Sequence, residues 1–285
     1  MLRQYDLMGN LVDKVQIAID RLKAFEPEDG YYLAFSGGKD SCCIKELAIM
    51  AGVKYDAHYN VTTVDPPELV RFIKYQHPDV IFERPELPMR KLIVKAGMMP
   101  TRTIRYCCNV LKEGGGKGRV VVTGVRWAES QRRRKQHGVA RVGEAKNAVI
   151  MNDDNDDSRR MVENCYRTRK TMLNPIVDWL DEDVWQFIHE NNLPYCSLYD
   201  EGKKRLGCIG CPMASQFERE EDFKRWPQYE KLYRKAIGNM IEMRRIKGKS
   251  LKRGLDTVDN VMDWWMERTR PDDVLQNQIS MEDDE

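Results

Sequence analysis

The chain has 285 residues, of which 41% are hydrophobic and 32% charged, with a net charge of +2 at pH 7. This length and composition predict one large folded domain, or a domain of about 200 residues with an appendage. The near balance of charge excludes a uniformly basic or acidic protein, so charged partners must be argued from local clusters.

The sequence contains neither a run near the ~18 apolar residues of a membrane span nor a signal peptide. We therefore expect a cytoplasmic protein without a membrane partner. Its eight cysteines are then expected to be metal ligands or reactive thiols rather than disulfides, because the cytosol keeps thiols reduced.

Helical and strand patterns alternate along the first part of the chain. The predicted elements are a helix over 11–25, a strand over 31–35, a helix to about residue 50, a strand over 53–61, a helix over 66–75, strands over 79–82, 119–123 and 147–151, and a helix over 181–191. Asp65 and Asp181 are expected to cap the helices that they precede. This alternation predicts an α/β fold with a doubly wound parallel sheet, whose ligands lie at the carboxyl ends of the strands.

The composition changes after residue 215. Residues 216–270 are rich in Arg, Lys, Met and Trp and predict a helical C-terminal extension, 271–285 an acidic, disordered tail, and 152–157 a solvated acidic loop. Basic and aromatic residues of the extension could contact nucleic-acid phosphates and stack on bases; a solvated helical face with core tryptophans is the alternative. These residues are Arg244, Arg245, Lys247, Lys249, Lys252, Arg253, Trp264 and Trp265.

A phosphate-binding pattern joins the first buried strand to its helix, Ser36-Gly-Gly-Lys-Asp-Ser41. The amides that begin a helix have no partner within it and attract anions. Gly37 and Gly38 let the backbone approach an anion closely, Lys39 adds charge, and the hydroxyls of Ser36 and Ser41 add donors. The pattern is not a Walker loop, and an ordinary strand–helix turn is the bland alternative.

This pattern resembles the PP-loop of the adenine-nucleotide α-hydrolase-like enzymes, and the chain resembles their phosphoadenosine phosphosulfate (PAPS) reductase family. The resemblance covers roughly residues 30–215. It also rests on Thr123-Gly-Val-Arg126 with Glu129-Ser130, Asn174-Pro-Ile-Val-Asp-Trp179, Asp181-Glu-Asp-Val-Trp185, Leu193-Pro-Tyr195 and Tyr199-Asp200. It implies a Rossmann-like sheet and an adenine nucleotide as cofactor or substrate, either ATP or a sulfonucleotide such as PAPS or adenosine phosphosulfate (APS).

The resemblance also implies where the nucleotide binds. Gly124 and Arg126 should lie beside it, with Glu129 and Ser130 nearby in the same motif. Arg132 or Arg133 should approach the phosphates, although a solvated basic loop is an equal interpretation.

Asp40 and Asp65 are candidates for Mg²⁺ or ribose contacts, but a carboxylate at a helix start is often only a cap. Lys39, Asp40 and Arg126 are the predicted catalytic residues. Of these, Lys39 and Arg126 would stabilise charge on the α-phosphate and the leaving pyrophosphate.

Two cysteine pairs, Cys107-Cys108 and Cys208-x-x-Cys211, supply the four thiolates that zinc or an iron–sulfur cluster requires. The cluster-bearing sulfonucleotide reductases have this arrangement around a 4Fe-4S cluster, so the resemblance implies that cluster; structural zinc or no metal stay open. The first part of the chain, 1–215, is thus expected to be a nucleotide-binding and cluster domain.

The remaining cysteines are expected to be structural. Cys42 and Cys43 follow the PP-loop and predict core packing, and Cys165 and Cys196 are isolated. True sulfonucleotide reductases carry a nucleophilic cysteine in a C-terminal Glu-Cys-Gly motif. Here the last cysteine is Cys211, so that nucleophile is missing unless Cys165 or Cys196 replaces it.

The leading hypothesis is therefore ATP-dependent adenylation and sulfur transfer by a 4Fe-4S enzyme, as in DNA phosphorothioation or tRNA thiolation, with a nucleic-acid substrate and a cysteine desulfurase as sulfur donor. One alternative is a PAPS or APS reductase with a relocated nucleophile and a thioredoxin-like reductant. A second is a non-catalytic nucleotide-sensing or nucleic-acid-binding protein. The oligomeric state stays open.

Overall fold

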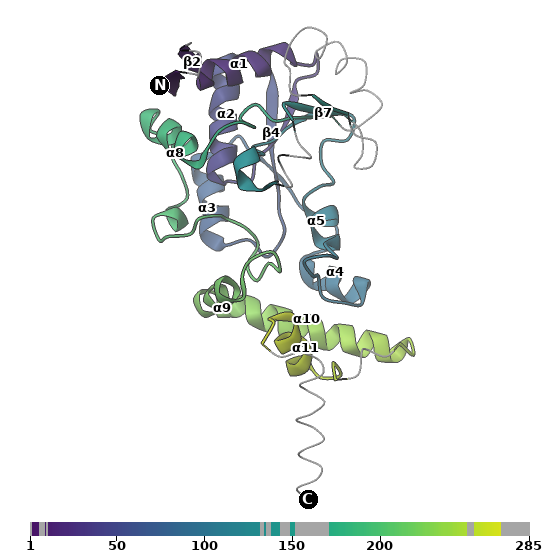
Figure 1. Cartoon of the computed structure of the whole chain (residues 1–285). Helices are drawn as coiled ribbons and strands as arrows, with labels where there is room; N and C mark the ends of the chain where they lie inside the picture. The colour runs from purple at the N-terminus through teal and green to yellow at the C-terminus, as the bar shows by residue number, and fades with distance from the viewer. Residues whose placement is uncertain are drawn as a thin grey trace, which may run out of the picture. The chain divides into compact units, whose positions relative to one another are not determined.

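The computed structural model describes residues 2–5, 9, 11–131, 134, 138–142, 149–151, 171–249 and 254–268 (Figure 1). The chain forms two compact units that interleave along the sequence. The first contains Met1–Asn60, Pro67–Glu83 and Gly115–Leu206, and the second Val61–Pro66, Arg84–Gly114 and Gly207–Glu285. The segments 1–215, 216–270 and 271–285 expected from the composition stay predictions, and the tail and the 152–157 loop lie outside the described residues.

The first unit is built on a seven-stranded sheet of order β5-β4-β3-β6-β9-β7-β8. Its parallel strands are β3 (Tyr31–Ala34), β4 (Tyr55–Asn60), β5 (Ile81–Glu83), β6 (Val120–Val122) and β9 (Thr171–Leu173). The strands β7 (Ala140–Val142) and β8 (Val149–Met151) pair antiparallel at one edge. The predicted α/β fold class is confirmed. The strand predicted over 147–151 corresponds to β8, which is antiparallel to its neighbour β7. The fifth parallel strand, β9, was not predicted.

Four helices of the first unit accompany this sheet, α1 (Lys14–Ala24), α2 (Lys39–Ala51), α3 (Pro67–Gln76) and α8 (Asp181–Glu190). Helix α2 packs against both α1 and α8. The unit also contains the short strands β1 (Arg3–Tyr5) and β2 (Leu11–Asp13) and the 3₁₀ turns η1 (Trp127–Glu129) and η2 (Ser197–Tyr199). The first helix was predicted to begin at residue 11 but begins at Lys14. Residues 11–13 instead form β2, which pairs with β1, and Asp13 is the N-cap of the helix.

Neither predicted aspartate cap has the expected role. The Asp65 carboxylate accepts a hydrogen bond from the backbone amide of Thr62 at 2.8 Å, so it closes the turn before α3. Leu180 is the N-cap of α8, and its amide donates to the Asp183 carboxylate at 2.7 Å. Asp181 is the first helical residue, which leaves its carboxylate available for contacts elsewhere.

The second unit is helical in the part that the structure describes. Its helices are α4 (Met89–Ala96), α5 (Tyr106–Leu111), α9 (Gln216–Arg225), α10 (Pro227–Ile246) and α11 (Val258–Trp265). The long helix α10 packs against α4, α9 and α11, around the buried rings of Phe223, Tyr233 and Trp265. The helical character predicted after residue 215 is confirmed here. No helix among the described residues is long and apolar enough to cross a membrane.

Candidate functional site

The Ser36–Ser41 motif joins β3 to α2 in the first unit, and its last three residues begin the helix. Gly37 has a φ of +72°, and a β-carbon there would meet Leu69 and Ile73 of α3 at 2.7 Å, so only glycine fits. Gly38 is the N-cap of α2 and brings no side chain that could cap the helix. The first amides of a helix attract anions, and of these the amide of Lys39 already donates to Tyr199.

Side chains hold this loop in shape. The buried Ser41 hydroxyl donates to the Gly38 carbonyl at 2.7 Å, and the amide of Gly38 donates to the exposed Ser36 Oγ at 3.4 Å. The amide of Lys39 donates to the hydroxyl oxygen of Tyr199 at 3.0 Å. Segments far apart in the sequence thus fix the first turn of α2.

Two cations and two carboxylates form an ion network at the start of α2. Arg126, which follows β6 and is only 2% exposed, donates through Nε to Asp40 at 2.6 Å and through Nη2 to Asp181 at 2.7 Å. The buried Lys39 Nζ lies 3.0 Å from the same Asp181 oxygen and 3.6 Å from Asp40. The Trp179 carbonyl accepts from Nη1 of Arg126 at 3.3 Å. Every polar nitrogen of the guanidinium is therefore held in place.

The network favours the charged forms of Arg126 and Asp181. Burial alone would lower the pKa of Arg126, but the charge of Asp40 and the hydrogen bond to Asp181 outweigh it and raise that pKa. Burial alone would raise the pKa of Asp181, but hydrogen bonds from Lys39 and Arg126 outweigh it and lower that pKa. With two charges of each sign the network is neutral, so a phosphate must compete with Asp40 and Asp181 for the cations.

The motif after β6 positions Arg126. A β-carbon on Gly124 would lie 2.9 Å from the Asp40 β-carbon and 3.1 Å from its carbonyl carbon, so the glycine permits β6 to exit directly against α2. The Glu129 carboxylate accepts from the Arg126 amide at 3.2 Å. Ser130 is exposed next to this turn. Gly124 and Glu129 thus act on Arg126 by packing and by hydrogen bonding.

The structure brings most of the predicted nucleotide residues together in the first unit, with one exception, Asp65, which belongs to the second. Arg132 and Arg133 lie outside the described residues. Sequence reasoning missed Asp181 and Tyr199 as members of the site. Both stand in segments that carry the family resemblance, which was the available signal.

The four predicted metal-ligand cysteines all belong to the second unit. Cys107 and Cys108 lie on α5, and Cys208 and Cys211 lie in the turn before α9. A hydrogen bond from Cys107 to Cys108 raises the pKa of Cys107 and lowers that of Cys108, and the charges of Cys208 and Cys211 raise the pKa of Cys107 further. The thiols are thus near enough to influence one another.

No three Cys, His, Asp or Glu side chains among the described residues are arranged so that they could hold a metal ion. The cluster expected on Cys107, Cys108, Cys208 and Cys211 is therefore not shown. The chemistry of four neighbouring thiols nevertheless fits a thiolate-ligated group. The charge of Cys208 raises the pKa of Lys112, which places a cation beside these thiols.

The other described cysteines are poor nucleophiles. Cys42 and Cys43 are 4% and 0% exposed, which confirms their predicted core packing. Burial raises the pKa of Cys42 to about 12. Cys196 is also buried. Cys165 lies outside the described residues.

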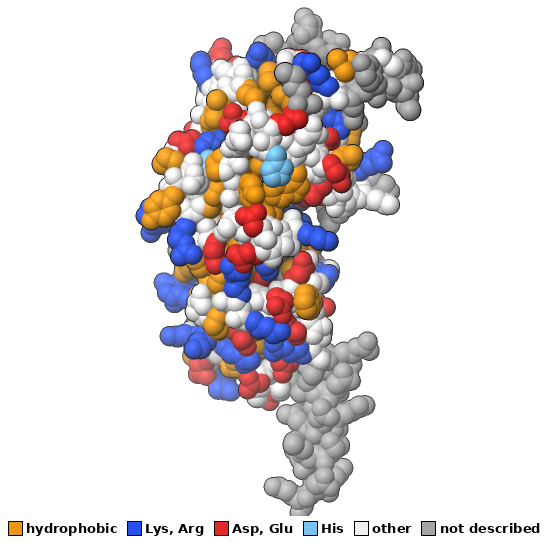
Figure 2. All heavy atoms as spheres, turned by 90° about the vertical axis from the view of Figure 1, so that its left-hand side faces the viewer, with side chains coloured by type: hydrophobic (Ala, Val, Ile, Leu, Met, Phe, Trp, Pro, Cys, Tyr) orange, Lys and Arg blue, Asp and Glu red, His pale blue; other side chains and the backbone are white. Residues whose placement is uncertain are grey.

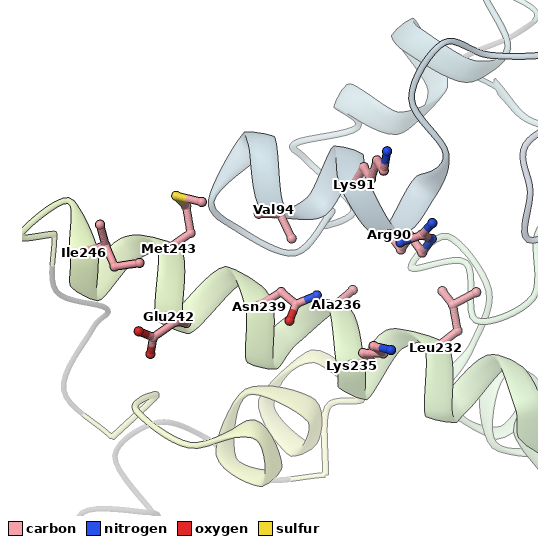
Figure 3. Close-up of a pocket in the computed structure, with 10 residues that line it drawn as sticks. All are labelled: Arg90, Lys91, Val94, Leu232, Lys235, Ala236, Asn239, Glu242, Met243 and Ile246. Carbon is pink, nitrogen blue, oxygen red and sulfur yellow. The ribbon is translucent and has the colours of Figure 1, made fainter.

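A groove of about 480 Å³ lies between α4 and α10 in the second unit (Figure 3). Val94 of α4 faces Ala236 and Asn239 of α10 in its floor. The lining includes the cations Arg90, Lys91 and Lys235 and one carboxylate, Glu242. Over the face drawn in Figure 2, by contrast, positive and negative side chains are interspersed. The groove is a local basic feature.

Comparison with known proteins identifies relatives. A family model for the phosphoadenosine phosphosulfate reductase domain matches residues 30–214. An adenosine 5'-phosphosulfate reductase of Oceanobacillus iheyensis is 34% identical over 65 residues, which are 23% of this chain and 27% of the relative. An uncharacterized protein of Methanocaldococcus jannaschii is 30% identical over 197 residues, 65% of this chain and 42% of the relative.

An adenosine 5'-phosphosulfate reductase of Lysinibacillus sphaericus is 22% identical over 59% of this chain and 64% of the relative. The matched segments therefore span less than two thirds of the length of these relatives. Among solved structures, a phosphoadenylyl-sulfate reductase of Candida auris has 16% identity and a TM-score of 0.47, and covers 69% of this chain and 88% of that one.

Proposed function

Because the chain belongs to the phosphoadenosine phosphosulfate reductase domain family, we propose that it binds ATP on its PP-loop and adenylates an oxygen of an acceptor, which sulfur then replaces. The observation that carries this proposal is the ion network of Lys39, Asp40, Arg126 and Asp181 at the start of α2. Two buried cations beside the first amides of a helix suit a chain of phosphates.

The proposed reaction has two bond exchanges. An acceptor oxygen attacks the α-phosphorus of ATP, the bond to the β-phosphate oxygen breaks, and pyrophosphate leaves. A cysteine desulfurase supplies the sulfur as a persulfide, and two electrons from a thiol reductant release that sulfur as sulfide. The sulfide attacks the adenylated carbon or phosphorus, and the former acceptor oxygen leaves with AMP. The adenylation and the displacement themselves transfer no electrons, so the thiol reductant is consumed only in releasing the sulfide.

The residues of the network have distinct tasks in this proposal. Arg126 and Lys39 leave their carboxylate partners and stabilise the charge that grows on the α-phosphate and on pyrophosphate. The α2 amides bind the phosphate side of the nucleotide, and Gly37 keeps the loop flat against α3. Asp40 and Asp181 are the carboxylates that would hold the Mg²⁺ accompanying ATP. The acceptor that we propose is a nucleic acid, either a DNA backbone or a tRNA base.

We further propose that Cys107, Cys108, Cys208 and Cys211 hold a 4Fe-4S cluster, with structural zinc as the alternative. Support comes from the thiol of Cys107, which interacts with those of Cys108, Cys208 and Cys211 in the same unit, and from the cation of Lys112 beside Cys208. A cluster supplies redox and sulfide-binding chemistry when bound. The four cysteines would hold it in place, and Lys112 would offset part of its negative charge.

The competing proposal is a PAPS or APS reductase that uses a thioredoxin-like reductant. Burial of Cys196 disfavours it as the relocated nucleophile. ATP–pyrophosphate exchange by the purified chain, with the acceptor varied between DNA and tRNA, tests the leading proposal. Sulfite release from PAPS or APS with reduced thioredoxin, without such exchange, would replace it by the reductase.

A further inference from the structure

The Cys208–Cys211 turn rests on the helices that follow it. The Tyr233 hydroxyl of α10 donates to the Ile209 carbonyl at 3.0 Å, and the amide of Gly210 donates to the Asp222 carboxylate of α9 at 3.3 Å. Gly210 has a φ of +68°, and a β-carbon there would lie 2.6 Å from the Phe223 ring. Residues beyond the family match therefore determine the shape of this turn.

Arg219 of α9 is buried in the same place. Its exposed fraction is 0%. Nη2 donates to the Trp265 carbonyl at 2.7 Å, and the guanidinium lies 4.5 Å from the centre of the Trp265 ring. Neither Nε nor Nη1 has a hydrogen-bond partner within the described structure. This guanidinium therefore keeps unused donor capacity inside the unit.

The nearby carboxylate compensates this buried charge only weakly. Glu267 lies 3.7 Å from Nη1 of Arg219, its side chain is 51% exposed, and it also pairs with Arg102 at 3.4 Å. Burial lowers the pKa of Arg219, and the charges of Glu267 and Cys211 oppose that effect. A buried charge is retained where an opposite charge or hydrogen bonds compensate for its lost hydration. The Trp265 ring on which this guanidinium packs lies 3.4 Å from the position that a β-carbon on Gly210 would take. The Cys208–Cys211 turn, which carries two of the thiols, therefore packs on the same ring as Arg219.

We propose that Arg219 is a built-in counter-charge for an anionic, thiolate-ligated metal group on Cys107, Cys108, Cys208 and Cys211. This inference rests on the metal-binding part of the proposed function. Four thiolates carry more negative charge than one zinc ion or an oxidised four-iron core carries positive charge. The assembled group is therefore an anion, and a buried guanidinium beside it lowers its energy.

Arg219 is a positioning residue in this arrangement, because it acts on the bound group through charge and has no role as a metal ligand. Through Arg219, helix α9 would contribute to the electrostatics of the thiol site. A change of charge at such a surrounding residue typically alters metal affinity by about 10- to 100-fold. It also alters the reduction potential, because reduction adds negative charge that the guanidinium stabilises.

The test uses the full-length chain with Arg219→Gln, which removes the charge, and Arg219→Lys, which retains it. Arg225→Gln is the matched control, since Arg225 is an exposed arginine of the same helix that lies over the Trp226 ring. Each protein is reconstituted anaerobically with iron and sulfide, and separately with zinc. Metal per chain, affinity in chelator competition and midpoint potential of the iron form are measured.

We expect Arg219→Gln to lower metal affinity about 10- to 100-fold and to shift the midpoint potential to more negative values. Arg219→Lys should recover most of both, and Arg225→Gln should match the wild type. Thermal unfolding of the metal-free proteins checks the fold. If Arg219→Gln does not fold, Arg219→Met replaces it, because an unbranched apolar side chain suits a buried site.

Unchanged affinity and potential in a folded charge-removing variant would overturn the proposal, as would a wild-type chain that takes up neither iron nor zinc. A loss of metal-free stability with unchanged potential would assign Arg219 a packing role only. ATP–pyrophosphate exchange is measured on the same samples. Its failure in the wild type would reject the adenylation proposal while leaving the result on Arg219 intact.

Discussion

The guanidinium of Arg126 donates to Asp40 at 2.6 Å and to Asp181 at 2.7 Å. These two hydrogen bonds join Arg126, in the segment that follows β6, to the first turns of α2 and α8. A buried arginine held between two carboxylates is oriented before any ligand arrives, and in the proposed reaction it exchanges these partners for phosphate oxygens. The same carboxylates reduce its attraction for phosphate in the free protein.

Replacement of Arg126 tests that role. We expect Arg126→Lys to reduce ATP–pyrophosphate exchange by about 100-fold or more, because a lysine cannot form the paired hydrogen bonds that a guanidinium forms. Lys39 would remain paired with Asp181, so the fold should persist. Arg3→Gln, which breaks the exposed ion pair with Asp13, is the control and should leave exchange unchanged. Equal exchange in both variants would refute a catalytic role.

A comparison of Gly37 with Gly52 distinguishes the cost of backbone strain from the cost of steric overlap when alanine replaces glycine. Gly37 and Gly52 have similar positive φ values of 72° and 69°, but only Gly37 has atoms where a β-carbon would go. Gly52→Ala should cost about 1 kcal/mol of unfolding free energy through its backbone conformation. Gly37→Ala should cost about 3 kcal/mol, because overpacking against α3 adds about 2 kcal/mol. Urea unfolding measures both, and equal costs would contradict the close approach.

His77 gives the first unit a dependence of stability on pH. Burial lowers its pKa to about 4, with a contribution from the charge of Lys45. Because the unfolded histidine titrates near about 6.5, the unfolded chain binds the proton first as the pH falls. Stability is therefore retained above about pH 6.5 and falls toward pH 4, by roughly 3 kcal/mol.

Urea unfolding of His77→Gln at pH 7.5, 5.5 and 4.5 checks this prediction. Loss of the histidine should flatten the fall in stability between pH 7.5 and 4.5. His189→Gln is the control, since His189 is exposed while His77 is buried. A pH dependence that is the same in both variants would assign the effect to other groups.

The groove between α4 and α10 offers a test of nucleic-acid binding. Neutralising Arg90, Lys91 and Lys235 together with glutamine should weaken binding of duplex DNA or tRNA. It should also reduce the slope of log affinity against log salt by about 0.7 to 0.9 for each phosphate that the protein no longer neutralises. Filter binding at several salt concentrations measures the slope.

The control for this groove neutralises three exposed lysines of the first unit, Lys23, Lys54 and Lys74. It changes the net charge by the same amount, so a purely long-range effect would appear equally in both. An equal weakening in the two triple variants would exclude the groove as a specific binding surface for nucleic acid.

The thiols of the second unit make a prediction about metal content. Cys208→Ser and Cys107→Ser should each lower iron and sulfide per chain and weaken the broad absorption near 400 nm expected of thiolate-ligated clusters. Cys42→Ala, which changes a buried cysteine of the first unit, should retain both. A colourless wild type loaded with zinc would favour the structural zinc alternative.

The sequence by itself predicted the α/β class, the strand–glycine–helix junction at Ser36–Ser41 and the core packing of Cys42 and Cys43. These features depend on local patterns, namely runs of apolar residues, turn residues and short motifs. The three-residue strand β9 escaped prediction because so short a segment has no periodicity of its own. Its place in the sheet depends on pairing with β6 and β7.

Only the tertiary structure determined which side chains Asp181 contacts and that the four thiols, which come from two separate segments, belong to one unit. A cap at Asp181 was a sound local inference, but the partner of its carboxylate, Arg126, comes from another segment of the chain. Likewise only the fold could pack the buried guanidinium of Arg219 on Trp265, the ring that also lies against Gly210 of the Cys208–Cys211 turn. Local propensities act over a few neighbouring residues, whereas charge pairing and burial depend on which distant segments pack together.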